Sequence, residues 1–90
     1  MQVRFLSLER DGIFLLGYKL KLSPTEERLL RAIAEGGKTD INHLSSILPE
    51  GVSRGNVAVH INAINRKAEK LSQRKLVIYK DSRYELNPFM

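Results

Sequence analysis

Residues 53–71 constrain the fold of this chain more than any other stretch. Their apolar positions recur with the period of one helical face, at Val57, Ile61, Ile64, Ala68 and Leu71. The opposite face would carry amides, small apolar groups and cations, at Val59, Asn62, Ala63, Arg66 and Lys70, with Asn56 at its N-terminal shoulder. We expect a helix that buries one face and offers the other to base edges and phosphates. The alternative is an ordinary surface helix that happens to be rich in asparagine.

Positive charge is concentrated in the C-terminal part of the chain. Residues 1–50 hold seven Lys or Arg and seven Asp or Glu, whereas residues 51–90 hold eight against three. The formal net charge of +5 therefore lies entirely in the second segment. Such a one-sided excess favours a polyanionic partner, and nucleic acid is the commonest one.

Several classes of protein do not fit the sequence. With no cysteine there is no disulfide framework and no cysteine-ligated zinc. Ser45 and Ser46 lack the context of a catalytic nucleophile, and His43 and His60 lack a metal-ligand spacing. We expect no enzyme activity, no catalytic residue, no metal and no cofactor.

No apolar run approaches the ~20 residues that span a bilayer, and the N-terminus has no signal-peptide pattern. We therefore expect a cytoplasmic protein without a membrane partner. Ninety residues are enough for one domain with a single hydrophobic core.

The first 22 residues predict a small antiparallel meander. Residues 3–8 are β-prone, residues 9–12 are a turn signal, and residues 13–16 form a short apolar run. Residues 19–22 then alternate, so that the two leucines face inward and Lys19 and Lys21 face water.

A strong helix start follows the meander. Ser23 is the expected N-cap, Pro24 suits the first helical position, and Glu26 completes a capping box. The helix would bury Leu29, Leu30 and Ile33 and would end at the glycine pair 36–37.

A second, shorter helix would be capped by Thr39 or Asp40 and would end at residues 49–51. Its expected buried side consists of Ile41, Leu44, Ile47 and Leu48. Ser53 or Asn56 could cap the third helix. A link of about five residues between these helices suits a helix-turn-helix.

The C-terminal segment predicts a β-hairpin. Residues 76–80 and 83–86 are β-prone and flank the polar pair 81–82. A two-residue turn would pair Tyr79 with Tyr84, Val77 with Leu86, and Lys80 with Arg83. The last pair sets like charges opposite each other, which costs stability unless an anion lies between them. Asp81 could relieve part of that cost, and a three-residue turn would shift the register.

The order of elements predicts an α+β fold, a winged helix-turn-helix with an N-terminal antiparallel meander, three helices and a C-terminal β-hairpin wing. We expect one domain over residues 1–90. Residues 1–22 would form the strands, 23–72 the three-helix core and 73–88 the wing.

Three segments resemble the winged-helix effector domains of OmpR/PhoB-type response regulators. They are residues 22–26 followed by Leu29 and Leu30, residues 57–61 followed by Ile64, Arg66 and Lys67, and residues 76–86 with Tyr84 near the end. The resemblance implies sequence-specific binding of double-stranded DNA by a transcription regulator. It also implies RNA polymerase and a second copy on tandem half-sites as further partners, although the loop that touches the polymerase in relatives is short here.

The resemblance assigns major-groove contacts to Asn56, Val59, His60, Asn62 and Ala63. It places Arg66 and Lys67 along the DNA backbone and Lys80 on the wing, near the minor groove. The basic residues themselves form a candidate phosphate-facing set, which consists of Arg54, Arg66, Lys67, Lys70, Arg74, Lys75, Lys80 and Arg83.

Other interpretations remain open for single residues and for the whole chain. Asn56 could serve as a helix cap, Val59 could pack on a neighbouring turn, and His60 could be a partly buried structural residue. Where relatives often place arginines, this chain has Asn62, Ala63 and Asn65 on the face that we expect to be exposed. The alternative function is therefore a protein-interaction winged helix that does not touch DNA. RNA binding ranks third, because the chain lacks an aromatic stacking platform.

Overall fold

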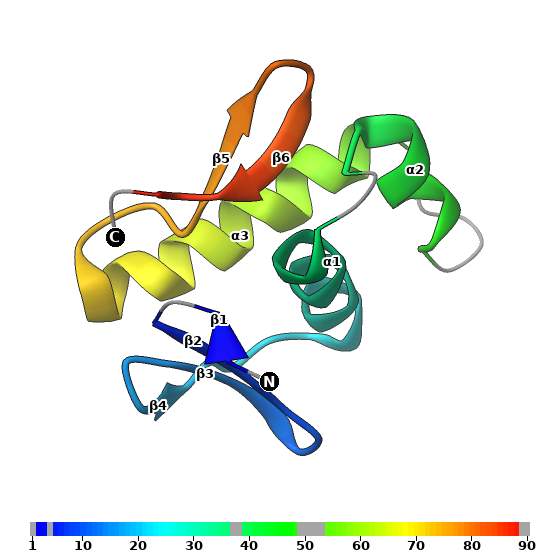
Figure 1. The fold of residues 1–90 in the computed structure, drawn as a ribbon. Coiled ribbons are helices and arrows are strands. Elements are labelled where there is room, and N and C mark those ends of the chain that lie inside the picture. The colour runs from blue at the N-terminus through cyan, green and yellow to red at the C-terminus, as the bar shows by residue number, and fades with distance from the viewer. Residues whose placement is uncertain (1, 4, 37–38, 49–53, 89–90) are drawn as a thin grey trace.

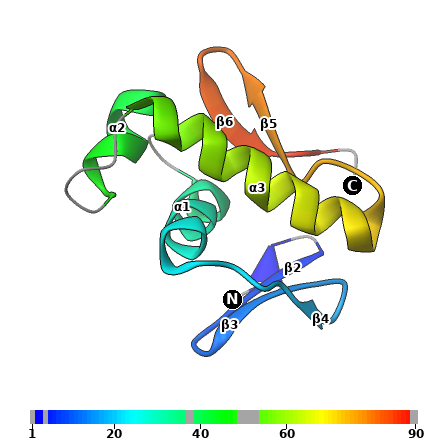
Figure 2. The ribbon, with the colours of Figure 1, turned by 180° about the vertical axis from the view of Figure 1, so that it is seen from behind.

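The computed structural model describes residues 2–3, 5–36, 39–48 and 54–88. Within them the chain is a small α+β domain with three helices, an N-terminal antiparallel sheet and a C-terminal antiparallel hairpin (Figure 1). Both views place the sheet and the hairpin on opposite sides of the long third helix (Figure 2). In the described part of the chain, no helix is long and apolar enough to cross a membrane.

The N-terminal sheet has four strands in sequential order, namely β1 (Gln2–Val3), β2 (Leu6–Glu9), β3 (Gly12–Leu15) and β4 (Tyr18–Lys19). The predicted inward side is confirmed, since Leu20 is buried and Leu22 is partly buried, whereas Lys19 and Lys21 are exposed. The last strand is shorter than expected and ends at Lys19. Beyond it, the Leu20 N–H still donates to the Ile13 carbonyl at 2.9 Å.

Helix α1 (Pro24–Glu35) begins as the sequence predicts. The Glu26 N–H donates to Ser23 Oγ at 3.2 Å, and the Ser23 N–H donates to Glu26 Oε1 at 2.8 Å, which completes the capping box. Leu29, Leu30 and Ile33 are buried, as expected. Gly36 is the C-cap, and Gly37 lies outside the described residues.

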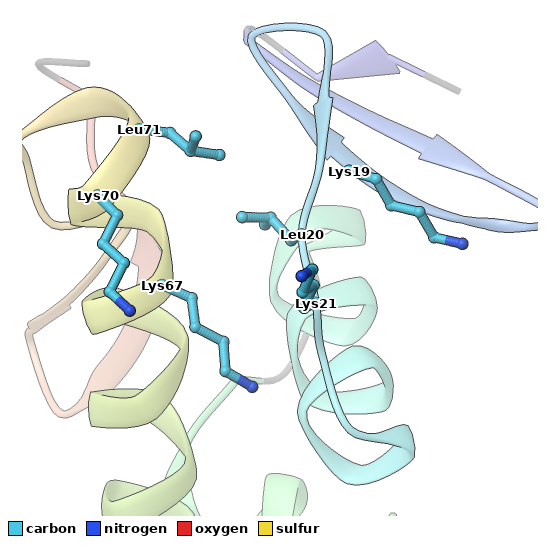
Figure 3. Close-up of a pocket in the computed structure, with 6 residues that line it drawn as sticks. All are labelled: Lys19, Leu20, Lys21, Lys67, Lys70 and Leu71. Carbon is cyan, nitrogen blue, oxygen red and sulfur yellow. The ribbon is translucent and has the colours of Figure 1, made fainter.

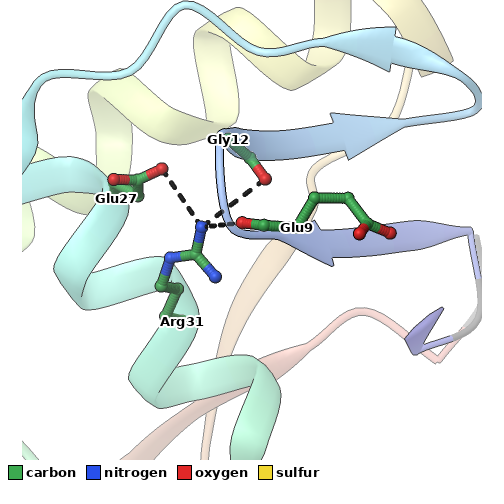
Figure 4. Close-up of polar contacts among 4 residues, drawn as sticks. All are labelled: Glu9, Gly12, Glu27 and Arg31. Carbon is green, nitrogen blue, oxygen red and sulfur yellow. Dashed lines mark hydrogen bonds and ion pairs between the residues drawn. The ribbon is translucent and has the colours of Figure 1, made fainter. Parts of the chain in front are cut away.

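The side chain of Arg31 links α1 to the N-terminal sheet by hydrogen bonds (Figure 4). Its guanidinium donates to the main-chain carbonyls of Glu9 and Gly12, the second at 3.5 Å, and pairs with the Glu27 carboxylate at 3.3 Å. A single cation therefore binds two carbonyls at the β2–β3 turn and a side chain one helical turn away.

Helix α2 (Ile41–Ser46) is capped by Asp40, whose carboxylate accepts from the His43 N–H at 2.8 Å. Asp40, rather than the alternative Thr39, is therefore the cap. Leu44 and Leu48 are buried, and Ile41 and Ile47 pack against the core. The predicted helix end at residues 49–51 lies outside the described part of the chain.

Helix α3 (Arg54–Ser72) packs against both other helices. Four of the five predicted core positions are confirmed as buried, at Val57, Ile61, Ile64 and Ala68. The prediction for Leu71 is wrong, since its side chain is 38% exposed. The last turn of α3 reaches beyond the core, where Leu71 only lines a surface groove beside Leu20. Asn56 lies inside the helix rather than at its cap, and the other candidate cap, Ser53, is not described.

The hairpin of β5 (Val77–Lys80) and β6 (Arg83–Leu86) has the predicted register, with Tyr79 opposite Tyr84 and Lys80 opposite Arg83. Asp81 and Ser82 both have positive φ, 52° and 64°, as a type I′ turn requires. The Tyr84 N–H donates to the Thr39 carbonyl at 3.0 Å, which ties β6 to the segment before α2.

Candidate nucleic-acid interface

The outward face of α3 gathers the residues that the sequence singles out on this helix. Val59 is 58% exposed, and its neighbours Asn56, Asn62, Arg66 and Lys70 are exposed as well. His60, Ala63 and Lys67 lie at the margins of this face and are partly buried. Amides, a small apolar group and cations thus share one surface over successive helical turns. We call this surface the α3 face.

The α3 face carries hydrogen-bonding and charged groups that the fold leaves unused. Within the described residues, Asn62, Arg66 and Lys70 have no side-chain hydrogen bond or ion pair to the rest of the protein. Their backbone is held by a helix whose opposite side is in the core. The α3 face is therefore a rigid surface with free donors, acceptors and positive charge.

The hairpin tip supplies a second group of exposed polar residues. Lys80, Asp81, Ser82 and Arg83 are all exposed, and Lys80 lies directly opposite Arg83. Two cations in this register repel each other in the free protein. Arg54, the remaining member of the predicted site, lies in the first turn of α3, but its side chain is outside the described set.

A groove of about 470 Å³ lies at the surface between α3 and the hairpin. Its lining includes Asn62 and Lys75, and Tyr79 stands on its hairpin side. Tyr79 is 56% exposed, and its ring lies 4.9 Å from that of the buried Tyr84. The sequence identified Tyr79 only as a cross-strand partner of Tyr84. Alternation along a strand gives a residue's side of the hairpin but not whether another element covers it.

Asn65 does not belong to the α3 face, contrary to the prediction from sequence. Its side chain is only 8% exposed, and it bonds the backbone of β5 twice. Asn65 Nδ2 donates to the Val77 carbonyl at 3.0 Å, and the Val77 N–H donates to Asn65 Oδ1 at 2.8 Å. Asn65 therefore positions the hairpin relative to α3.

Lys67 forms an ion pair with Glu26 inside the protein. Its ammonium lies 2.5 Å from Oε1 of Glu26, a residue that is only 5% exposed. Burial would raise the pKa of the Glu26 carboxyl, but the hydrogen bonds from Lys67 and Ser23 and the charge of Lys67 together lower it. The carboxylate stays ionised and neutralises Lys67, so this lysine adds less charge to the surface than Arg66 or Lys70.

Among the residues that the structure describes, no three His, Cys, Asp or Glu side chains come together as a group that could hold a metal ion. Comparisons of the chain with protein-family models, with curated proteins and with solved structures find no match. The function must therefore be inferred from the α3 face and the hairpin tip themselves.

Proposed function

We propose that this chain is a winged helix-turn-helix that binds double-stranded DNA in a sequence-specific way, as the DNA-binding part of a transcription regulator. In this proposal α3 enters the major groove, and the hairpin is the wing that approaches the minor groove or the backbone. The observation that carries it is the α3 face, where free amides and cations stand on a helix fixed by its buried side.

The dimensions and chemistry of the α3 face suit a DNA groove. An α-helix with its side chains is about 10–12 Å across, and the major groove is about 12 Å wide. The Asn62 amide could donate to N7 of an adenine and accept from the N6 amine of the same base. Such a bidentate pair is worth roughly 1–3 kcal/mol of discrimination against the wrong base. Val59 could contact a thymine methyl group, because its branched side chain is open to solvent.

The cations at the hairpin tip support the same proposal. Lys80 and Arg83 are opposed across a two-residue turn, and both are exposed. A phosphate between them would turn an unfavourable pair into two favourable contacts. Arg66 extends the positive surface along α3 toward its C-terminal end.

A random-oligonucleotide selection, followed by salt titration of the selected duplex, tests the proposal. Four to six phosphate contacts predict that the logarithm of the binding constant falls by about 0.9 per contact for each unit of log salt concentration. Asn62→Ala should weaken the selected duplex much more than a scrambled one, whereas Lys80→Gln should weaken both about equally. Absence of any duplex binding at low salt, or a bound duplex with no salt dependence, would reject the proposal.

The second candidate is a protein-interaction module with the same fold. Phe5, Leu16 and Tyr18 are exposed on the N-terminal sheet and its turns and could form a contact surface for another protein. This function predicts no duplex binding at low salt and resonance changes at these residues when the partner protein is added.

A further inference from the structure

A second basic surface lies on the side of α3 opposite the hairpin. It is a groove of about 300 Å³ between the C-terminal half of α3 and the segment that joins β4 to α1, and it is lined by Lys19, Leu20, Lys21, Lys67, Lys70 and Leu71. We call it the lysine groove. Four of its six residues are cationic and none is acidic. Two of the lysines come from the N-terminal segment, where the sequence predicts only a meander with Lys19 and Lys21 facing water.

The groove has an apolar floor and cationic sides (Figure 3). Leu20 and Leu71 point toward each other across it, while Lys67 extends from α3 toward the segment that carries Lys21 and Lys70 lies along α3. Lys19 turns its ammonium away, and its side chain lies close against Gly12. The ammonium groups that remain at the groove are therefore those of Lys21, Lys67 and Lys70.

Lys21 and Lys70 are the cations free to bind a ligand there. Both are exposed, and within the described residues neither has an ion pair or side-chain hydrogen bond. Lys67 is neutralised by Glu26 at 2.5 Å. Two unpaired ammonium groups beside an apolar floor fit a phosphodiester strand, whose oxygens are anionic and whose sugars are largely apolar.

The position of the groove connects it to the α3 face. Lys70 follows Asn62 by eight residues, which is about 12 Å along the helix axis at 1.5 Å per residue. In helix-turn-helix domains the N-terminal part of the recognition helix contacts the base edges. If Asn62 contacts bases inside the groove, the C-terminal end of α3 therefore lies toward one of the strands that border it.

We propose that the lysine groove binds the DNA phosphate backbone on the side of the major groove away from the hairpin, with Lys21 and Lys70 as the phosphate contacts. This inference rests on the proposed function and extends it to the N-terminal segment. The duplex is then held on both sides of α3, by the hairpin tip at one flank and by the β4–α1 segment at the other.

The test compares two double variants that remove equal charge. Lys21→Gln with Lys70→Gln empties the groove of its free cations. Arg10→Gln with Arg28→Gln is the matched control, because both arginines are exposed and neither lines the groove. Thermal unfolding checks that the variants keep the fold of the parent, which we expect since all four side chains are exposed.

Binding of the selected duplex is then measured over a range of salt concentrations. Loss of two phosphate contacts should reduce the log–log salt slope of the groove variant by about 1.8, with unchanged preference for the selected sequence. The control should keep the parent slope, and Lys21→Arg with Lys70→Arg should restore it. Hydroxyl-radical footprinting should show protection lost on one strand, beyond the edge of the major groove.

The outcomes separate this inference from the proposed function. If the parent binds with a steep salt slope and the groove variant keeps that slope, the lysine groove does not contact DNA, and the proposed function stands. Equal changes of slope in the groove and control variants would also overturn the inference, because they would show only a dependence on net charge. A parent that binds no duplex overturns both.

Discussion

At the scale of single residues, two asparagines on α3 illustrate how burial decides function. Asn62 and Asn65 lie three positions apart, yet Asn62 is exposed and free, whereas Asn65 is buried and bonds both backbone groups of Val77. The amide chemistry that suits adenine also suits a backbone N–H and C=O pair. Only the packing of the hairpin against α3 distinguishes the two roles.

We predict that Asn65→Ala lowers the free energy of unfolding by about 2–4 kcal/mol, because it leaves two buried backbone groups of Val77 without partners. Asn62→Ala, the same substitution at an exposed position, should change it by less than about 0.5 kcal/mol. Urea unfolding at neutral pH measures both. Equal values for the two variants would contradict the structural role of Asn65.

We predict that the free energy of unfolding depends on pH through the ionisation of Glu26. Its folded pKa lies below the ordinary value of 4.5, so the carboxylate stabilises the fold above that pH, and the contribution is lost as pH falls through the folded pKa. Glu26→Gln should lower the free energy of unfolding by about 1.5–2 kcal/mol at neutral pH, the lower part of the range for a hydrogen bond to a charged group, because Lys67 can rehydrate.

Urea unfolding at several pH values from neutral down to about 3 tests this expectation. The difference between the parent and Glu26→Gln should shrink as pH falls below 4.5. Glu27→Gln, which removes a half-exposed partner of Arg31, serves as the control and should cost less than about 0.5 kcal/mol. A parent-to-variant difference that stays constant with pH would show that the Glu26–Lys67 pair is not the cause.

At the scale of elements, local signals were the most informative part of the sequence. The capping box at Ser23 and the register of the hairpin were predictable, because each depends on residues within a few positions of one another. The exposure of Leu71 and the burial of Asn65 could not be predicted. The helical period gives the direction in which a side chain points, but not where the elements that cover it begin or end. The lysine groove could not be predicted for the same reason, because its lining residues lie about 50 positions apart in the sequence.

The hairpin turn gives a prediction at this scale. Ser82 has a φ of 64°, a left-handed conformation that costs a residue with a Cβ about 1–2 kcal/mol and glycine little. Since glycine also gains freedom in the unfolded chain, Ser82→Gly should raise the free energy of unfolding by about 0.5–1 kcal/mol. Thermal unfolding measures the gain, and Ser82→Ala, which keeps the Cβ, should show none. A gain in the alanine variant would contradict the explanation by strain.

At the scale of the whole molecule, the charge asymmetry of the sequence becomes a spatial arrangement. Of the cations in residues 51–90, Arg66 and Lys70 lie on the α3 face, Lys67 lies at its margin, and Lys80 and Arg83 lie at the hairpin tip. Lys21 from the N-terminal segment extends the basic surface to the other side of α3. The sequence could predict the excess of charge and the residues of α3 that carry it. It could not predict the contribution of Lys21, because that lysine alternates with apolar residues like any exposed strand position.

The most direct measurement is mapping of amide resonances of the labelled protein as a selected DNA duplex is added at low salt. We expect the shifts to concentrate on the exposed residues of α3 between Asn56 and Lys70 and on the hairpin tip between Lys80 and Arg83. Shifts confined to the exposed apolar residues Phe5, Leu16 and Tyr18 of the N-terminal sheet, or no shifts at all, would contradict it.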